Sequence, residues 1–276
     1  MSENVQLVFY IFMAIALIMF MINSIFLISK GFCDKKRNLL VLGLSFLFIT
    51  LTYLVVAVEL NWSLINTTRV SAYVLMVFFI NETYYKNRRS PKNLILVLCV
   101  IIYVVQMVLS VSIYELGLIT QSVITQTVSN ILDMILNSSV FLWFGLASHN
   151  ALQNLKNKEI EPWIKLRLRL VAFSAFIMVF FEVPSLMRYD PSIEYADPDN
   201  LLSMIVVFIH LAILLLFVVA EGIAWMMPKW LKTYLNKESE FTFTSKEEEE
   251  ITEEVILKRL REALWNEPDE RSNVDD

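Results

Sequence analysis

The chain has 276 residues and a net charge of −5, with 57% hydrophobic and only 18% charged residues. Soluble domains contain about 45–50% apolar and about 25% charged residues, so this composition excludes an ordinary soluble protein. The apolar residues gather in blocks of roughly 20, the length at which a helix crosses the roughly 30 Å hydrocarbon core of a bilayer. The sequence therefore predicts an all-α, polytopic protein of the cell membrane, with the lipid bilayer as its first partner.

Seven apolar blocks are long enough to be transmembrane helices. In chain order they lie at about 5–29, 38–60, 64–84, 93–114, 119–147, 164–187 and 200–227. We interpret residues 1–227 as one seven-helix transmembrane domain.

Basic residues distinguish the connections between these helices. The second, fourth and sixth connections have only Arg69 and Arg188 at their edges. The first, third and fifth connections hold Lys30, Lys35, Lys36, Arg37, Lys86, Arg88, Arg89, Lys92, Lys156, Lys158, Lys165, Arg167 and Arg169. Because cytosolic connections retain Lys and Arg, this asymmetry predicts an N-terminus outside the cell and a C-terminus inside.

The segment 228–237 follows the last apolar block. Its apolar residues recur at helical spacing, and its lysines lie on the opposite side of the helix. The apolar residues are Trp230, Leu231, Tyr234 and Leu235. This pattern predicts a short amphipathic helix that lies in the inner membrane interface.

Residues 238–276 form an acidic tail, with 14 acidic and 5 basic residues. Ser245 and Glu248 match a capping box, and an irregular apolar stripe follows, so we expect a helix at about 246–265. A single amphipathic helix is marginal in water. We therefore expect it to dock on its own membrane domain, on a second copy of the chain or on a cytosolic partner protein.

The fifth block carries an unusual polar stripe. Its members, Gln126, Asn130, Asp133 and Asn137, are spaced by four, three and four residues, which places them on one helix face. Two interpretations remain open at this stage. The stripe either lines a water-filled path or ligand pocket, or it bonds to a neighbouring helix across a tight interface.

Three further ionisable residues fall within the sixth and seventh blocks, namely Glu182, His210 and Glu221. Counting 1.5 Å per residue, we expect an outer polar layer of Glu59, Glu182 and His210. By the same count, an inner layer contains Asn130, Asp133 and Glu221. Ionisable side chains inside a membrane usually face the bundle interior or a cavity, so these residues are candidate ligand-binding or polar-layer residues.

No catalytic or cofactor motif is present in the sequence. The two histidines, His149 and His210, are far apart, and neither a metal-binding spacing nor a Gly-rich phosphate loop nor a Gly-X-Ser-X-Gly elbow occurs. We therefore expect no metal, no cofactor, no nucleic-acid partner and no enzymatic activity.

The seven-helix plan with an outside N-terminus resembles microbial rhodopsins and G-protein-coupled receptors in outline, and also the seven-helix sensor modules of bacterial signalling proteins. The resemblance is one of topology. Residues 201–227 contain no lysine, so a retinal Schiff base is not expected in the seventh helix. The run at 81–86 departs from the receptor Asp/Glu-Arg-Tyr motif, and the seventh helix contains no proline.

Three functions fit this plan. The first is a sensor or receptor-like protein that relays a signal to a cytosolic partner through its tail. The second is an ion channel or proton-coupled transporter that uses the polar stripe of the fifth helix. The third is a membrane scaffold that anchors a cytosolic complex.

The predicted orientation is testable by accessibility labelling. A cysteine introduced within Glu247–Glu250 should react with a membrane-impermeant maleimide only after the cells are lysed, because the tail is expected in the cytosol. Labelling of that cysteine on intact cells would reverse the orientation.

Overall fold

The computed structural model describes residues 3–57, 62–85, 91–116, 122–155, 161–187 and 200–237. All regular structure within these residues is helical. Glu59 and the predicted tail helix at 246–265 lie outside the described residues, so their predictions stay as they are.

Eight α-helices and two short irregular turns make up the described chain. They are α1 (Glu3–Cys33), α2 (Arg37–Ala57), α3 (Trp62–Tyr84), α4 (Lys92–Ser110), the π-helical turn η1 (Val111–Glu115), α5 (Val123–Asn154), α6 (Pro162–Val179), the 3-10 turn η2 (Val183–Met187), α7 (Leu201–Met226) and α8 (Lys229–Lys237).

Six of the described helices are long and apolar enough to cross a membrane, namely α1 to α5 and α7. The protein is therefore a multi-pass membrane protein. Helix α6 differs from these six in composition, because its 18 residues include Lys165, Arg167 and Arg169.

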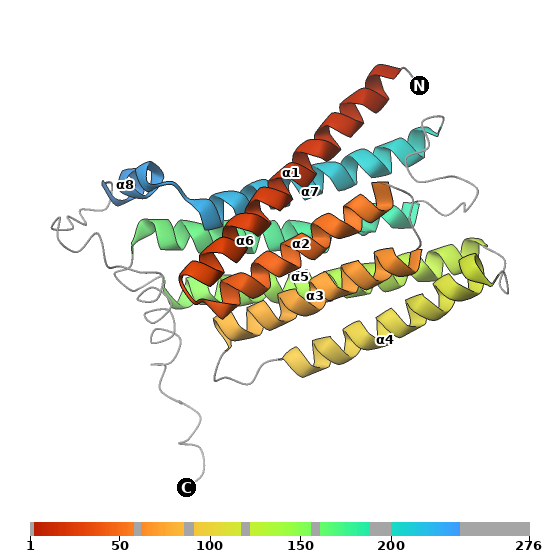
Figure 1. Cartoon of the computed structure of the whole chain (residues 1–276), viewed down its shortest axis with the longest axis horizontal. Coiled ribbons are helices and arrows are strands. Elements are labelled where there is room, and N and C mark those ends of the chain that lie inside the picture. The colour runs from red at the N-terminus through yellow and green to blue at the C-terminus, as the bar shows by residue number, and fades with distance from the viewer. Residues whose placement is uncertain are drawn as a thin grey trace, which may run out of the picture.

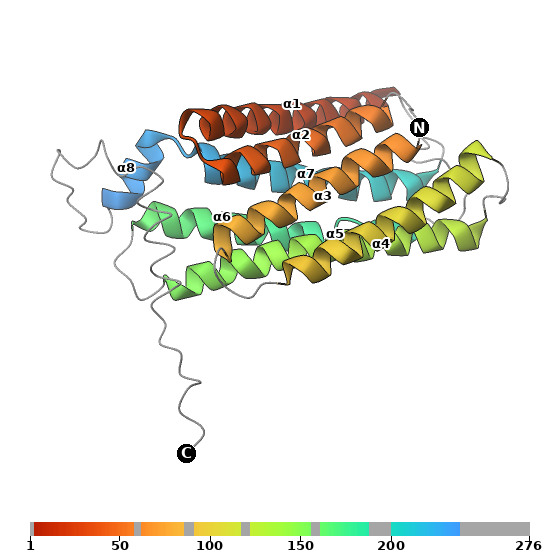
Figure 2. The same ribbon diagram turned by 60° about the horizontal axis from the view of Figure 1, so that its bottom comes forward.

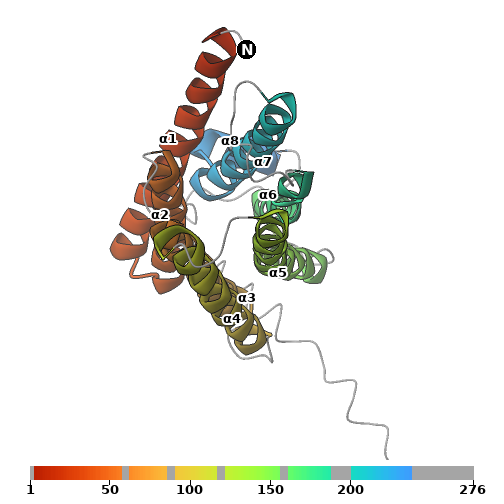
Figure 3. The ribbon, with the colours of Figure 1, turned by 90° about the vertical axis from the view of Figure 1, so that its right-hand side faces the viewer.

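Successive helices run in opposite directions and pack side by side (Figure 1). Helix α1 packs against α2 and α7, α2 against α3, α3 against α5, and α6 against α5 and α7, which closes a ring. Helix α4 packs against α3 and α5. Viewed along the bundle, α1 to α4 form one row and α5 to α7 the other (Figure 3). The short helix α8 lies at the end where α7 finishes and α6 begins (Figure 2).

A phenylalanine core joins the two rows. Its most deeply buried members are Phe20, Phe46, Phe79, Phe141, Phe144 and Phe217. The Phe217 ring of α7 lies 6.0 Å from the rings of both Phe20 and Phe46 and 5.5 Å from that of Phe141, mostly edge to face. Aromatic pairs prefer this geometry. In lipid, where apolar burial gives little driving force, such close packing is a principal source of helix association.

Helices α1 and α2 form a tight hairpin because two glycines permit close approach. A Cβ atom on Gly31 would lie 2.7 Å from the backbone of Leu40, and one on Gly43 would lie 2.8 Å from the backbone of Ile28. Ser24 Oγ donates to the Gly43 carbonyl at 2.8 Å across the same contact. Small residues at a helix interface are typical of membrane bundles. The two helices diverge toward the N-terminus of α1 (Figure 1).

The sixth predicted helix is interrupted near its outer end. The sequence predicts a continuous element at 164–187, whereas α6 ends at Val179 and a separate 3-10 turn covers Val183–Met187. Pro184 accounts for the break, because it has no N–H for the Phe180 carbonyl and its ring would clash there. The proline ring also disfavours the α conformation of the residue that precedes it.

The fifth helix is displaced along the chain from the predicted 119–147. It begins at Val123, after Ser122 accepts a hydrogen bond from the Thr125 backbone N–H as an N-cap, and it continues to Asn154. The side chain of Thr125 accepts in return from the Ser122 N–H at 2.9 Å. This reciprocal cap fixes the start of α5 four residues later than the hydropathy suggests.

The substitution Phe217→Ala should destabilise the bundle by about 2–4 kcal/mol, because the cavity term of a large-to-small change applies in lipid as it does in water. Reversible unfolding of the purified protein in mixed micelles would measure the change. Phe173→Ala is the matched control, since the Phe173 ring on α6 is 56% exposed. Equal losses in the two variants would show that Phe217 has no special role in the core.

Candidate functional site

A charged cluster joins α3, α4 and α5. Arg69 Nη2 of α3 lies 2.5 Å from Asp133 Oδ1 of α5 and donates to Gln106 Oε1 of α4 at 3.3 Å. Gln106 Nε2 in turn donates to the Asp133 carboxylate. Asn66 completes the cluster, because its Oδ1 accepts from Arg69 at 2.8 Å and its Nδ2 donates to Ser110 Oγ at 2.9 Å. We call Asn66, Arg69, Gln106, Ser110 and Asp133 the charged cluster.

Most of the surface of the Arg69 and Asp133 side chains is buried inside the protein. The two side chains are 18% and 15% exposed. An isolated charge in hydrocarbon is costly, and pairing together with hydrogen bonds to the remaining donors and acceptors reduces that cost. The neighbouring amides of Asn66 and Gln106 have this role here.

A second carboxylate faces the same arginine. Glu182, in the turn between α6 and η2, interacts electrostatically with both Arg69 and Asp133. It attracts the guanidinium and repels the other carboxylate. Arg69 is therefore paired with Asp133 on α5 and is also attracted over a longer distance by Glu182 in the turn after α6.

Glu182 is also linked to α7 through a serine. Ser185 Oγ lies 3.3 Å from Glu182 Oε2 and 3.3 Å from His210 Nε2. The His210 imidazole packs against the Phe181 ring at 4.8 Å and is 5% exposed. We call Glu182, Ser185 and His210 the polar relay. It connects the interrupted end of α6 with the N-terminal half of α7.

The amides of the α5 stripe bond mainly to the backbone at the interrupted end of α6. Asn137 Nδ2 donates to the Met178 carbonyl at 2.5 Å, and Ser138 Oγ donates to the Val179 carbonyl at 3.0 Å. Asn130 Nδ2 donates to the Ser185 carbonyl at 2.8 Å. The Phe181 N–H also donates to the Met178 carbonyl, so the α5 side chains add donors at a helix end where the regular helical hydrogen bonds stop.

These contacts separate the members of the polar stripe. Asn130 and Asn137 bond across a helix interface, as the second interpretation of the stripe expects, and Gln126 donates to Asn130 at 3.0 Å. Asp133 is different, because it points to α3 and α4 and belongs to the charged cluster.

A second buried polar group lies nearer to α8. Glu221 of α7 has no exposed surface, and it accepts from Ser174 Oγ of α6 at 2.6 Å and from Trp225 Nε1 at 2.7 Å. Arg167 of α6 interacts electrostatically with Glu221 and donates to the Ala224 carbonyl at 2.8 Å. This inner group holds α6 and α7 together by polar contacts.

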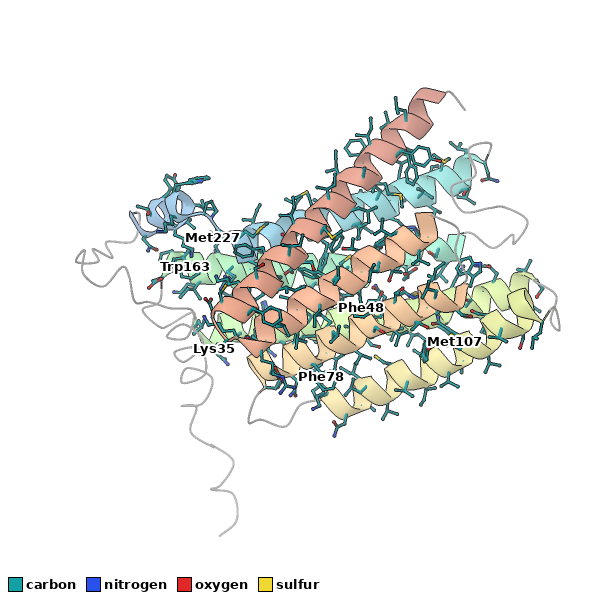
Figure 4. All side chains as sticks on the ribbon, viewed as in Figure 1. Lys35, Phe48, Phe78, Met107, Trp163 and Met227 are labelled. Carbon is teal, nitrogen blue, oxygen red and sulfur yellow. The ribbon has the colours of Figure 1, made fainter. Side chains whose placement is uncertain are left out.

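Cation–π contacts continue from this inner group to α8. The Arg167 guanidinium lies 4.7 Å from the Trp225 ring and 5.5 Å from the Trp163 ring. Lys232 Nζ of α8 lies 4.4 Å from the centroid of the same Trp163 ring. Trp163 and Met227 lie beside α8, at the same end of the bundle as Lys35, and Met107 lies toward the opposite end (Figure 4).

The predicted polar layers are partly regrouped by the structure. Asn130 and Asp133 were assigned to an inner layer with Glu221, but Asn130 contacts Ser185 and Asp133 interacts with Glu182. Both therefore belong with the group at the outer end of α6. The prediction was wrong here because α5 begins at Val123 and extends to Asn154, so these residues lie in its first third.

Sequence reasoning missed Arg69 and Gln106. Arg69 was treated as the edge of a short apolar block, yet α3 begins at Trp62 and buries it among polar partners. A single arginine within a predicted span, three residues after an asparagine, was the available signal. Gln106 lies in a strongly apolar block, where a single glutamine does not indicate which residues of other helices it contacts.

Comparisons of the chain with protein-family models, with curated proteins and with solved structures find no match. In the part of the chain that the structure describes, no three His, Cys, Asp or Glu side chains are grouped so that they could hold a metal ion. The chemistry of the site therefore has to be argued from its own geometry.

Neutralising either member of the ion pair should destabilise the protein, but by unequal amounts. Asp133→Asn leaves Arg69 with Glu182 as a partner, whereas Arg69→Gln leaves two carboxylates facing each other. We expect about 2 kcal/mol for the first change and about 3–5 kcal/mol for the second. A double-mutant cycle with reversible unfolding measures both, together with their coupling. Equal costs would show that Glu182 does not share Arg69.

Proposed function

We propose that the protein crosses the membrane seven times, with its N-terminus outside and its acidic tail in the cytosol. The alternating basic connections support this orientation. The position of α6 supports a seventh crossing, since it packs between α5 and α7 and is followed by η2 in the same predicted span. Its basic residues Lys165, Arg167 and Arg169 fall in its first half, which this orientation places toward the cytosol.

Within this topology we propose that the protein is a sensor or receptor-like protein. A stimulus at the outer end of the bundle would alter the sharing of Arg69 between Asp133 and Glu182. The change would pass along α6 to α8 and so to the tail, which would dock or release a cytosolic partner.

One observation carries this proposal: α6 contacts the polar groups at both ends of the bundle and also α8. Glu182 follows its outer end, while Ser174 and Arg167 bond to α7 in its inner half. Trp163 in its first turn contacts Lys232 of α8. A rigid helix with side-chain attachments at both ends transmits a small displacement over its length.

The outer attachment of α6 is suited to a shift between two arrangements. Beyond Val179 the regular helical hydrogen bonds stop, and side chains of Asn130, Asn137 and Ser138 bond to the carbonyls instead. Such contacts can exchange partners without unfolding a helix. Arg69 is likewise paired with Asp133 and attracted by Glu182, which supports two states that differ in the position of Arg69.

The same contacts disfavour a transport path along the α5 stripe. Asn130 and Asn137 bond to backbone carbonyls of α6 and η2, so their donors are not offered to a passing ion. A scaffold, in turn, would have no need for a charged cluster inside the membrane domain, since such groups are costly. These observations favour sensing over the two alternatives.

Spin-label distances across the inner end of the bundle test the relay. Labels would be attached at Gln153→Cys on α5 and Thr233→Cys on α8, in a background with Cys33→Ser and Cys99→Ser, in lipid nanodiscs. Arg69→Gln should shift the distance distribution by roughly 1–2 Å or more, a displacement typical of helix shifts between states. Glu182→Gln, which removes one of the two acids and keeps the fold contacts, should also shift it.

Tyr103→Phe is the matched control, because it removes an exposed hydrogen bond between α4 and Thr67 of α3 without touching the charged cluster. Its distribution should equal that of the parent protein. If Arg69→Gln and Glu182→Gln also match the parent, the relay through α6 is disproved. Ion flux into liposomes that contain this protein alone would favour the channel or transporter instead.

A further inference from the structure

The charges around Glu182 do not balance. Among the described residues, one cation, Arg69, faces the two carboxylates of Asp133 and Glu182. The titratable and polar groups around them come from every helix packed there: Arg69 and Tyr73 from α3, Gln106 from α4, Asp133 from α5 and His210 from α7. An uncompensated negative charge in a low-dielectric interior is costly, and two neighbouring carboxylates commonly share a proton for that reason.

The polar relay has the geometry to hold such a proton. Ser185 Oγ has one hydrogen and lies 3.3 Å from both Glu182 Oε2 and His210 Nε2. It can donate in one direction and accept from the other side. With Glu182 ionised, the hydroxyl donates to the carboxylate and accepts from the imidazole N–H. With Glu182 protonated, the carboxylic acid donates to Ser185, which donates to the unprotonated Nε2.

We propose that the natural stimulus at this site is a proton from the outer solution, which the polar relay binds as the carboxylic acid of Glu182. This inference rests on the proposed sensor function and names its ligand. The incoming proton binds His210 Nδ1, the Nε2 proton passes to Ser185 Oγ, and the Ser185 hydroxyl proton passes to Glu182 Oε2. The site gains one proton in all, Glu182 becomes neutral, and His210 keeps one proton, now on Nδ1. The group of Arg69, Asp133 and Glu182 then changes from a net charge of −1 to zero.

The proton resides on Glu182 rather than on His210 for an electrostatic reason. Protonated His210 beside ionised Glu182 would leave four charges in the bundle interior, including Arg69 and Asp133. Protonated Glu182 leaves only the Arg69–Asp133 pair, which is held at 2.5 Å and bonded to Gln106. Fewer buried charges cost less desolvation energy.

The polar relay lies near the C-terminal end of α6 and in the N-terminal half of α7. Glu182 precedes the polar segment that begins at Arg188 by six residues, a rise of roughly 10 Å. His210 lies ten residues after Asn200, the N-cap of α7, a rise of roughly 15 Å. In the proposed orientation both distances are measured from the outer surface.

Proton binding removes the attraction between Glu182 and Arg69. Arg69 then pairs with Asp133 alone, and the turn that carries Glu182 is no longer drawn toward α3. The displaced segment is the interrupted end of α6, so the proton acts on the same helix that contacts α8. External pH would in this way set the position of α6.

Infrared difference spectroscopy on the full chain in lipid nanodiscs tests the proton site directly. Lowering the pH should produce the carbonyl stretching band of a protonated carboxylic acid. In protein labelled with carbon-13 glutamate the band should move to lower frequency, because the proton is on a glutamate. Glu182→Gln should abolish the band, while Glu221→Gln, which alters the other buried glutamate, should retain it.

A band that persists in Glu182→Gln, or that does not move on glutamate labelling, would overturn the inference, and so would the absence of any such band in the parent protein. Variants are first compared by size-exclusion chromatography so that only folded protein is measured. The spin-label experiment separates this result from the sensor proposal. If Glu182 binds a proton but the α5–α8 distance does not change, the proton site is supported and signal transmission through α6 is disproved. If the distance changes but the infrared band is absent, transmission through α6 needs another stimulus and the proton site is disproved.

Discussion

Inside hydrocarbon a polar group has no water to bond, so it must find its partner within the protein. This constraint accounts for most of the contacts described above. Arg69 is tolerable because Asp133, Asn66 and Gln106 surround it. The end of α6 is tolerable because Asn137 and Ser138 of α5 bond to its last carbonyls. The polar side chains of this membrane domain are therefore concentrated where charges or interrupted backbone need them.

The break at Pro184 gives α6 a different character from its neighbours. A continuous helix satisfies its own carbonyls, whereas at the C-terminal end of α6 the side chains of Asn137 and Ser138 on α5 also bond to the Met178 and Val179 carbonyls. Such an end is held in place by a few exchangeable hydrogen bonds and by the charge on Glu182. Its opposite end is held by Arg167, Trp163 and Lys232 through cation–π and hydrogen-bond contacts. In the proposed sensor, a change at the C-terminal end of α6 would pass along this helix to α8.

The balance between Asp133 and Glu182 links the site to the function proposed for it. In the proposed sensor, the ion pair with Asp133 and the attraction of Glu182 would give Arg69 two arrangements, and a sensor needs two such states. A proton on Glu182 removes one of the two competitors, which makes the proton a chemically sufficient signal. The phenylalanine core, from Phe20 to Phe141 through Phe217, joins α1, α7 and α5.

The sequence by itself determined the apolar helices, the helical class, the uneven distribution of basic residues and the fact that α5 carries a polar stripe. These properties depend on local composition and on the fixed rise of a helix, so they can be read along the chain. Hydropathy gave most element boundaries within a few residues, but it missed the ends of α5 at Asn154 and of α6 at Val179, and it did not detect the cap at Ser122 or the interruption caused by Pro184. Both of these depend on individual hydrogen bonds rather than on average apolarity.

Only the tertiary structure decided which polar residues meet. The sequence grouped Asp133 with Glu221 because depth was counted from approximate boundaries, and it overlooked Arg69 and Gln106. Hydrogen bonds between α3, α4, α5 and the end of α6 join residues that are 27 to 64 positions apart in the sequence. Helix rotation and neighbour choice are set by packing across the whole bundle, and no local pattern in one helix encodes the face that its neighbour presents.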